Sequence, residues 1–416
     1  MTGSPRPPLK PLHAALQALL AYAQPLQALE SVATGLADGR VLAQDVASQL
    51  HVPPQDNSSM DGYALHCGDI HDHAQVFSVS QRIAAGMAGG PLQPGTVARI
   101  FTGAPIPPGA DAVVMQEECA ALPNPDSAGL LQVAVNATPI PGQWIRRAGE
   151  DVARGDVVLH RGQRLGPAEL GLAASIGLDQ LQVVRQPRVA LFSTGDELVM
   201  PGAVAPQDMP PGAIYNSNRF FLSALLRRMG CVVTDLGIVP DQREATVQAL
   251  REAALSHDVI LTSGGVSVGE EDHIKPAVQA LGALDLWQIA IKPGKPFAYG
   301  HIGGTHFLGL PGNPVSSLVT FLILVRPFLL RLQGVDDVAM KLVAARADFD
   351  WPRADKRQEF LRVRRNAQGG LDLFPNQSSG VLTSAVWGDG LVDNPAGKSI
   401  TYGDMVSYVP FAELMA

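Results

Sequence analysis

The sequence predicts a multidomain α/β protein whose central unit is a doubly wound, mostly parallel sheet. Its 416 residues are enough for roughly two to four domains of about 150 residues each. With 46% hydrophobic and 17% charged residues, the composition is that of an ordinary globular protein. Between residues 187 and 333, short apolar runs alternate with helical runs, a pattern typical of a parallel sheet with helices on both faces.

The first 150 residues predict a helical start followed by a β domain. Leucines 12, 16, 19 and 20 have helical spacing within 9–22, and Pro25 ends that segment. A second helix is expected over 26–38. After Val52 the pattern changes to short β-rich runs separated by Gly and Pro clusters, which predict a separate, mostly β domain. These runs are 76–79, 97–101, 112–115 and 130–135.

The doubly wound unit and the chain after it have equally distinct patterns. The strands expected in the unit are 189–193, 232–239, 259–262, 286–291 and 306–310, and the helices are 218–229, 243–255, 273–281 and 315–332. From 335 to 416 the chain returns to short β runs separated by Gly, Asn and Asp, which predict a small C-terminal β domain.

Charge and cysteine content exclude several functional classes. The net charge of −8 argues against a nucleic-acid or anionic-membrane partner. The cysteines, Cys67, Cys119 and Cys231, form neither a disulfide framework nor a CxxC zinc motif, which fits a reducing compartment. The strongest apolar run, 318–325, is too short to span a membrane, and residues 1–10 lack the apolar core of a signal peptide. We therefore expect a cytoplasmic protein.

Loops rich in Gly, Ser or Pro follow four of the predicted strands. Ligands of open α/β sheets bind beyond the carboxyl ends of the strands, where these loops should meet. The loops are 193–197, 263–269, 292–296 and 311–314. Any one of them alone is more simply a tight turn, whereas four together predict a site for a phosphate-bearing anion.

Residue types within the loops suggest separate roles. Glycines in 263–269 allow backbone amides to approach an anion, and the helix predicted after this loop has its positive dipole end there. Lys292 and Lys295 add positive charge. Glu197 and Asp272 are carboxylates that can hold Mg²⁺ against phosphate oxygens.

Longer motifs identify a family. The segment DNSSMDGYA at 56–64 resembles the DNSAMDGYA signature of the MoeA-type molybdopterin molybdenumtransferases, which include the E domain of gephyrin. Ser59 stands where Ala is usual, a change between small residues. The similarity continues in order along the chain through IFTGAP at 100–105, RRAGED at 146–151, STGDEL at 193–198, SGGVSVG at 263–269, KPGKP at 292–296 and GLPGNP at 309–314. It covers essentially the whole chain.

The resemblance implies a domain arrangement and an assembly. Residues 1–50 and 147–186 would form a discontinuous N-terminal α/β domain, with 51–146 as the inserted β-rich domain. Residues 187–334 would form the molybdopterin-binding domain and 335–416 a β barrel. The resemblance implies an elongated homodimer, with the active site between the α/β domain of one subunit and the inserted domain of the other.

The resemblance also implies a transferase reaction. Molybdate is inserted into adenylylated molybdopterin, the adenylate is hydrolysed, AMP leaves, and Mg²⁺ is required. The catalytic residues it suggests are Asp61, Thr102, Asp151, Glu197 and Asp272, of which Asp61, Glu197 and Asp272 would hold the metal. The ligand-binding residues would be Ser193, Thr194, Gly195, Asp241, Ser263, Gly264, Gly265, Val266, Ser267, Gly269, Lys292, Lys295, Pro311, Gly312, Asn313 and Pro314. Molybdate is expected near 311–314 and Ser316, at a helix N-terminus.

Simpler interpretations exist for several of these residues. Asp61 lies in a turn where Asp is common, Thr102 could cap a turn, and Asp151 could be a surface charge. The histidines of 66–73 have a metal-site composition but no standard zinc spacing, so a solvated loop is favoured.

Two other functions stay open at this point. One is a molybdopterin adenylyltransferase, because the α/β domain alone resembles those enzymes. The other is a scaffold or protein-binding relative of gephyrin. Expected partners are a second copy of the chain, a molybdopterin adenylyltransferase, and molybdoenzymes or their chaperones.

Overall fold

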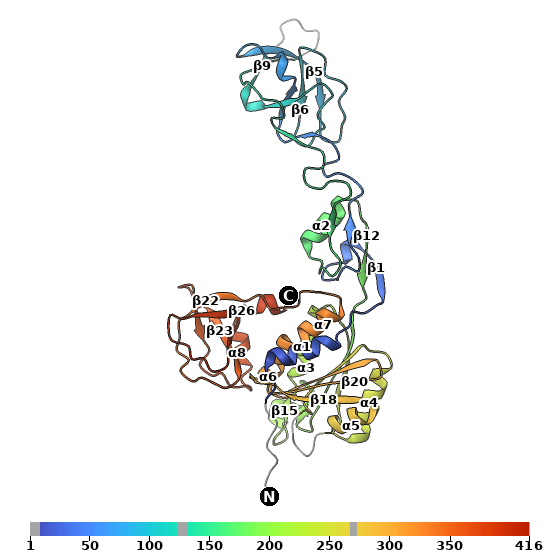
Figure 1. Ribbon diagram of the computed structural model, residues 1–416, viewed down its shortest axis with the longest axis vertical. Helices are drawn as coiled ribbons and strands as arrows, with labels where there is room; N and C mark the ends of the chain where they lie inside the picture. The colour runs from blue at the N-terminus through green and yellow to red at the C-terminus, as the bar shows by residue number, and fades with distance from the viewer. Residues whose placement is uncertain (1–8, 123–130, 267–272, 416) are drawn as a thin grey trace.

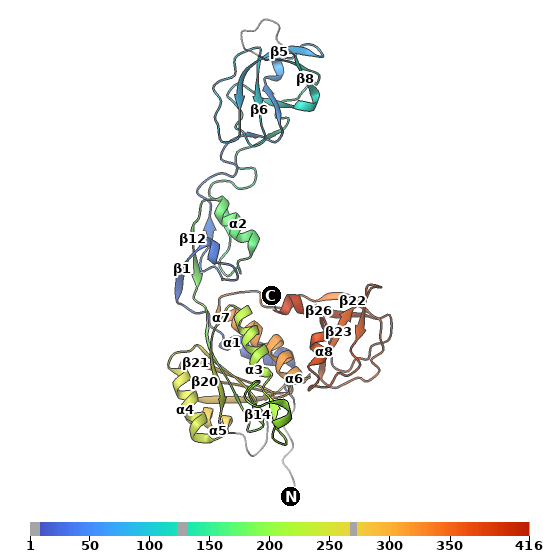
Figure 2. The ribbon, with the colours of Figure 1, turned by 180° about the vertical axis from the view of Figure 1, so that it is seen from behind.

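A computed structural model describes residues 9–122, 131–266 and 273–415. The molecule is elongated (Figure 1). The inserted β domain occupies one end, a small domain containing α2 and β12 forms the middle, and the α/β and C-terminal domains lie side by side at the other end. The view from behind shows the same separation (Figure 2).

The N-terminal segment starts with the predicted helix but does not continue with a second one. Helix α1 (Leu12–Tyr22) buries Leu12, Ala15 and Leu19 in the core of the α/β domain. The helix expected over 26–38 is wrong, because Leu29–Ala33 forms strand β1 and Thr34–Leu36 a 3-10 turn. Strand β1 pairs antiparallel with β12 (Gln180–Val184), so a partner distant in sequence overrides the local pattern.

The middle domain is built from two separate stretches of chain. Strand β2 (Val46–Ala47) pairs with β11 (Val157–Leu159), and α2 (Pro167–Ser175) packs beside them. Residues before 50 and after 150 therefore fold together.

The inserted domain is a six-stranded sheet in the order β7-β4-β6-β5-β9-β8. Its strands are β4 (Gly62–Leu65), β5 (Gln75–Ile83), β6 (Thr96–Ile100), β7 (Ala112–Met115), β8 (Cys119–Leu122) and β9 (Gln132–Val135). At its base, β3 (Asn57–Ser58) pairs with β10 (Ile145–Arg146).

The α/β domain confirms the predicted fold class. Its sheet has the order β16-β13-β17-β21-β20-β18. The first four strands are parallel to one another, and β20 runs antiparallel to both of its neighbours, β21 and β18. The strands are β13 (Arg188–Thr194), β16 (Val232–Val239), β17 (Val259–Ser263), β18 (Ala283–Gln288), β20 (Pro296–Ile302) and β21 (Thr305–Leu310). The strand expected over 286–291 ends at Gln288, and β20 was missed because it begins directly at the last Pro of a Pro- and Gly-rich loop.

Helices cover both faces of this sheet. Alternate residues of β13 enter two cores: Val189 and Leu191 pack on one side, Ala190 and Phe192 on the other. The first core also contains α1 and α3 (Asn218–Arg228), and the second contains α4 (Arg243–Ala254) and α5 (Ile274–Leu281).

One long apolar helix runs through the first core. It comprises α6 (Pro314–Thr320), a π-helical turn (Phe321–Val325) and α7 (Arg326–Leu332). The wider turn comes just before Pro327, which cannot donate to the helix ladder. By length and composition the helix could span a membrane, but 94% of its tested window is buried inside the protein. It therefore serves as a core helix of the α/β domain.

The C-terminal domain is a closed barrel. Its strands are β22 (Val343–Ala347), β23 (Gln358–Arg365), β24 (Gly370–Leu373), β25 (Gly390–Asn394) and β26 (Met405–Pro410), with helices α8 (Thr383–Trp387) and α9 (Phe411–Met415). Pairing of β23 with β25 closes the sheet. A short strand from the α/β domain, β19 (Ile291–Lys292), adds to β23 and joins the two domains.

Candidate active site

The predicted loops meet at one cavity of about 760 Å³, at the carboxyl ends of β13, β17 and β21. Its walls contain most of the residues expected to bind ligand. These are Ser193, Thr194, Gly195, Glu197, Asp241, Ser263, Gly264, Gly265, Val266, Pro311, Gly312, Asn313, Pro314 and Ser316. The convergence inferred from strand order is therefore present in the structure.

Glycines in the 263–269 loop are required by backbone geometry. Gly264 has φ +94°, and a Cβ there would lie 2.9 Å from the Thr194 carbonyl oxygen. The Gly264 amide donates to the Leu310 carbonyl (3.0 Å), so it does not serve the ligand as the sequence suggested. Gly265 has φ +67°, and a Cβ there would lie 2.5 Å from Cδ1 of Ile274. Both glycines allow the strand end to pack closely against its neighbours.

A polar segment that sequence reasoning missed, 214–218, forms another wall. Asn218 ties the loops together, because its Nδ2 donates to Ser263 Oγ and to the Gly312 carbonyl, both at 2.7 Å. Asn216 is 2% exposed, and its Oδ1 accepts from the Arg219 amide. The Asn-Ser-Asn triplet before an apolar run is a helix-start signal that could have drawn attention to these side chains.

Two buried donors of this cavity lack protein partners within the described residues. They are Nδ2 of Asn216 and Oγ of Ser193, which is fully buried. A buried polar group without a partner costs free energy, so a bound ligand that accepts from these groups would be favoured.

Carboxylates supply the charge of the cavity. Glu197 lies against Gly195, where an added Cβ would come within 2.5 Å of its Oε2. Asp241 also lines the wall. The described part of the lining contains no Lys, Arg or His, so its fixed charge is negative.

These oxygen donors suit Mg²⁺. The described residues contain no cluster of three or more His, Cys, Asp or Glu side chains able to hold a metal. Mg²⁺, however, is commonly held by one or two carboxylates together with substrate phosphates. Glu197 and Asp241 meet that requirement.

The two predicted lysines do not line the described cavity wall. Lys292 Nζ instead donates to Glu359 Oε1 (2.9 Å) and pairs with Asp355 Oδ2 (3.3 Å) in the C-terminal domain. The carbonyl of Lys295 accepts from the Ile289 amide (2.8 Å), and Pro296 is the residue of this loop that reaches the cavity.

Asp61 and Thr102 are brought together, but in the inserted domain. Asp61 Oδ1 accepts from the Thr102 amide (2.8 Å) and from Thr102 Oγ1 (2.7 Å). These hydrogen bonds, the backbone one first, lower the pKa of the Asp61 carboxyl below its usual value. Asp61 is therefore held ionised and oriented.

Asp151 lies at the base of the inserted domain, in a second cavity of about 430 Å³. Val52, Pro53, Asn57, Arg146 and Glu150 line the same cavity. Figures 1 and 2 show the middle domain between this region and the α/β domain. A single chain therefore does not bring Asp61, Thr102 and Asp151 to the larger cavity.

Comparison with known proteins decides the family. Three family profiles match in order: the MoeA N-terminal region, domains I and II, over 10–177; a probable molybdopterin binding domain over 190–331; and the MoeA C-terminal region, domain IV, over 344–411. The molybdopterin molybdenumtransferase of Haemophilus influenzae is 44% identical over 302 residues, which are 72% of this chain and 71% of that protein. The chain belongs to the MoeA family of molybdopterin molybdenumtransferases.

Other MoeA relatives extend this similarity over nearly the whole chain. The molybdopterin molybdenumtransferase of Synechococcus elongatus is 36% identical over 404 residues, covering 92% of this chain and 95% of that one. The crystal structure of the molybdopterin biosynthesis moeA protein from Pyrococcus horikoshii superposes with a TM-score of 0.83 at 27% identity, covering 97% of this chain and all of that one. The resemblance inferred from the motifs is thus confirmed.

Within this MoeA fold, the expected molybdate position has few available amides. Pro314 has no N–H, and the Val315 amide donates to the Ser379 carbonyl at 2.9 Å. The residues expected there, 311–314 and Ser316, all line the cavity. Ser267, Gly269 and Asp272 lie outside the described residues.

Proposed function

We propose that this protein catalyses insertion of molybdate into adenylylated molybdopterin, with release of AMP. One observation carries the proposal: four loops of the domain that matches a molybdopterin-binding profile converge on one cavity at the strand ends. The names of the relatives supply the reaction class, a molybdopterin molybdenumtransferase.

Neutral hydrogen-bond donors and carboxylates have different roles in this cavity. Ser193 and Asn216 donate from buried positions to the phosphate oxygens, and the Ser263–Asn218–Gly312 hydrogen bonds keep the loops in place. Glu197 and Asp241 would hold Mg²⁺, which neutralises negative charge as the phosphoanhydride is cleaved.

The assembly we propose is a homodimer with composite sites. Asp61 with Thr102, and Asp151, would reach the cavity of the partner subunit, because the elongated shape separates them from the cavity of their own chain. The ionised Asp61 carboxylate would then be available to orient water or metal. We also propose cytoplasmic location, with a molybdopterin adenylyltransferase and molybdoenzymes or their chaperones as partners.

Complementation between two inactive variants tests the composite site. Asp61→Asn and Glu197→Gln should each abolish formation of molybdenum cofactor and AMP. Random co-assembly of the two variants should restore about a quarter of wild-type activity, because half the dimers are mixed and each mixed dimer has one intact site. Co-assembly of Asp61→Asn with the double variant is the control, since it leaves no intact site. Recovery in the control, or none in the first mixture, would contradict the arrangement.

Measuring AMP and cofactor formation with two substrate mixtures distinguishes the proposed reaction from that of an adenylyltransferase. Purified protein receives either adenylylated molybdopterin with molybdate and Mg²⁺, or molybdopterin with ATP and Mg²⁺. We expect AMP and cofactor in the first reaction. Adenylylated product in the second reaction alone would show the alternative to be correct.

A further inference from the structure

The cavity wall is built by two domains. Gly380 of the barrel lines it beside Pro296 and Pro314 of the α/β domain. The Ser379 carbonyl accepts from the Val315 amide at 2.9 Å. The position of the barrel therefore affects the shape of the ligand site.

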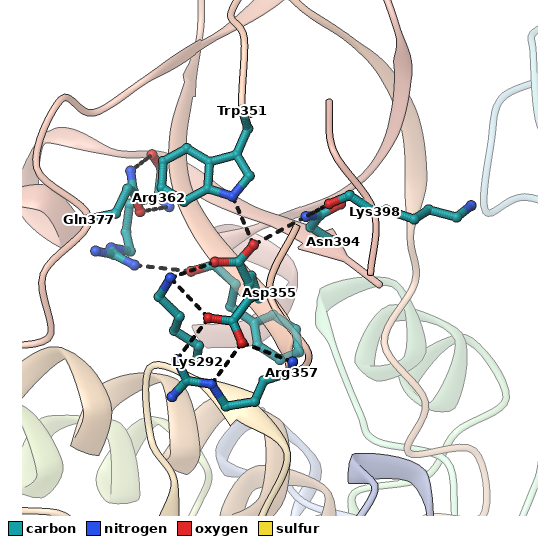
Figure 3. Close-up of polar contacts among 10 residues, drawn as sticks. Lys292, Trp351, Asp355, Arg357, Arg362, Gln377, Asn394 and Lys398 are labelled. Carbon is teal, nitrogen blue, oxygen red and sulfur yellow. Dashed lines mark hydrogen bonds and ion pairs between the residues drawn. The ribbon is translucent and has the colours of Figure 1, made fainter. Parts of the chain in front are cut away.

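Lys292 and Glu359 join the two domains at the loop that precedes Pro296. They are direct partners in the β19–β23 ladder, and Lys292 Nζ donates to Glu359 Oε1 at 2.9 Å. Backbone and side chain thus connect the same two residues. Figure 3 shows Lys292, Asp355, Trp351 and Asn394 pointing toward one another at this junction.

Glu359 is 1% exposed, and its other oxygen is also satisfied. Its Oε2 accepts from Trp351 Nε1 (2.8 Å) and from Asn394 Nδ2 (3.4 Å). A buried carboxylate with a fixed acceptor geometry holds a cation at a defined position. Here that cation is Lys292.

Asp355 holds Lys292 less directly, because both of its carboxylate oxygens already accept hydrogen bonds from Arg357. Its two oxygens accept from Arg357 Nε and Nη2 at 3.0 and 2.9 Å, and its distance to Lys292 is longer, at 3.3 Å. The Arg357 hydrogen bonds hold the pKa of Asp355 well below its usual range. Glu359 is therefore the carboxylate that holds Lys292 most directly.

We propose that Glu359 is a positioning residue for ligand binding, acting through Lys292. It fixes Lys292 and with it the segment 292–296, so that Pro296 stays in the cavity wall. Lys292 is 37% exposed, and its ammonium group donates to Glu359 Oε1 and pairs with Asp355 Oδ2, so it acts on the cavity through the position of its loop. The inference rests on the proposed function and adds the barrel carboxylate that sets this wall.

A double-mutant cycle in the full-length protein tests the proposal. Glu359→Gln and Lys292→Met are made singly and together, and Asp348→Asn is the control. Asp348 is also a paired barrel carboxylate, bonded to Arg346 at 2.7 and 3.0 Å, and it accepts a further hydrogen bond from Asn366 within the barrel. KM for adenylylated molybdopterin and kcat are measured for each variant.

We expect each single variant to raise KM about tenfold, or 1.4 kcal/mol, with kcat within about twofold of wild type. The double variant should be no worse than the more affected single variant, because both changes remove the same interaction. Asp348→Asn should leave KM unchanged. KM effects that multiply in the double variant, or a fall in kcat with normal KM, would overturn the proposal.

Hydrogen exchange provides a readout that does not need turnover. Glu359→Gln should speed exchange of the amides in 289–298 at least about tenfold relative to Asp348→Asn. Unchanged exchange in this segment would overturn the positioning role even in an active enzyme. If the wild-type protein failed to convert adenylylated molybdopterin, the proposed function would fall, and the exchange result alone would decide whether Glu359 positions the loop.

Discussion

Replacing Gly294 with alanine probes the same loop by backbone strain. Gly294 has φ +114°, outside the left-handed region that other residues reach at modest cost. A Cβ there would lie 2.4 Å from Thr320 Oγ1 and 3.2 Å from Ile291 Cδ1. Thr320 is fully buried in α6 and β-branched, so it has little room to move. Backbone strain of about 1–3 kcal/mol and overpacking of about 1–3 kcal/mol predict a loss of roughly 2–6 kcal/mol in unfolding free energy.

The matched control is Gly303→Ala. Gly303 has φ +59°, and a Cβ there meets no heavy atom within 4 Å, so only the left-handed backbone cost of about 1 kcal/mol applies. Urea unfolding followed by circular dichroism measures both variants, and KM for adenylylated molybdopterin reports the displaced loop. Adding Thr320→Ala to Gly294→Ala should recover the overpacking part alone. The reasoning is refuted if Gly294→Ala is no more destabilising than Gly303→Ala.

Three further predictions address other parts of the molecule. Asn216→Ala should raise KM for adenylylated molybdopterin about tenfold, as measured by steady-state kinetics. Asn216→Asp should raise this KM further, because Asp can still accept from the Arg219 amide but places a negative charge beside the anionic substrate. Thr102→Val removes one hydrogen bond to Asp61, so the acidic limb of the kcat–pH profile should move to higher pH. Asp258→Asn should cost about 2–3 kcal/mol in urea unfolding, since it breaks a two-bond pair with Arg185 at 2.8 and 2.9 Å.

The Asp258 prediction has a definite pH dependence. Burial alone would raise the pKa of Asp258, but the hydrogen bonds from Arg185 and from the Arg188 amide outweigh it and hold the pKa below 3.8. A group with a depressed pKa stabilises the folded state fully above its unfolded pKa and loses that contribution as pH falls through the folded value. The gap between wild type and Asp258→Asn should therefore be constant above about pH 5 and shrink in more acidic solution. A gap that grew as pH fell would contradict this assignment.

The fold was predictable where pattern and packing agree. Strand β16 has the predicted bounds, although it is a largely exposed edge strand. Strands β13 and β17 differ from the prediction by one residue at one end or both, because their apolar runs coincide with buried strands. The helix expected over 26–38 failed for the opposite reason. Its residues pair with 180–184 to form a ribbon, and that partner cannot be seen in a local pattern.

The site was predictable as a meeting of loops but less so residue by residue. Strand order alone places Ser193, Ser263 and Gly312 at one sheet edge, and the structure confirms this. Whether an amide or an ammonium group faces the ligand depends on which neighbour it binds. Gly264 and Lys292 were both assigned to the ligand, yet the first donates to Leu310 and the second to Glu359.

The pairing of Lys292 with Glu359, in place of a ligand, determines the electrostatics of the cavity. With Lys292 drawn to a buried carboxylate, the described walls contain Glu197 and Asp241 but no fixed cation. Two like charges about 5 Å apart repel by about 3 kcal/mol at an effective dielectric constant of 20, so these carboxylates oppose the entry of a diphosphate. A divalent cation bound to the same carboxylates reverses the sign of this interaction. Binding of the diphosphate should therefore be coupled to Mg²⁺ through Glu197 and Asp241, while Glu359 keeps Lys292 at the edge of the site.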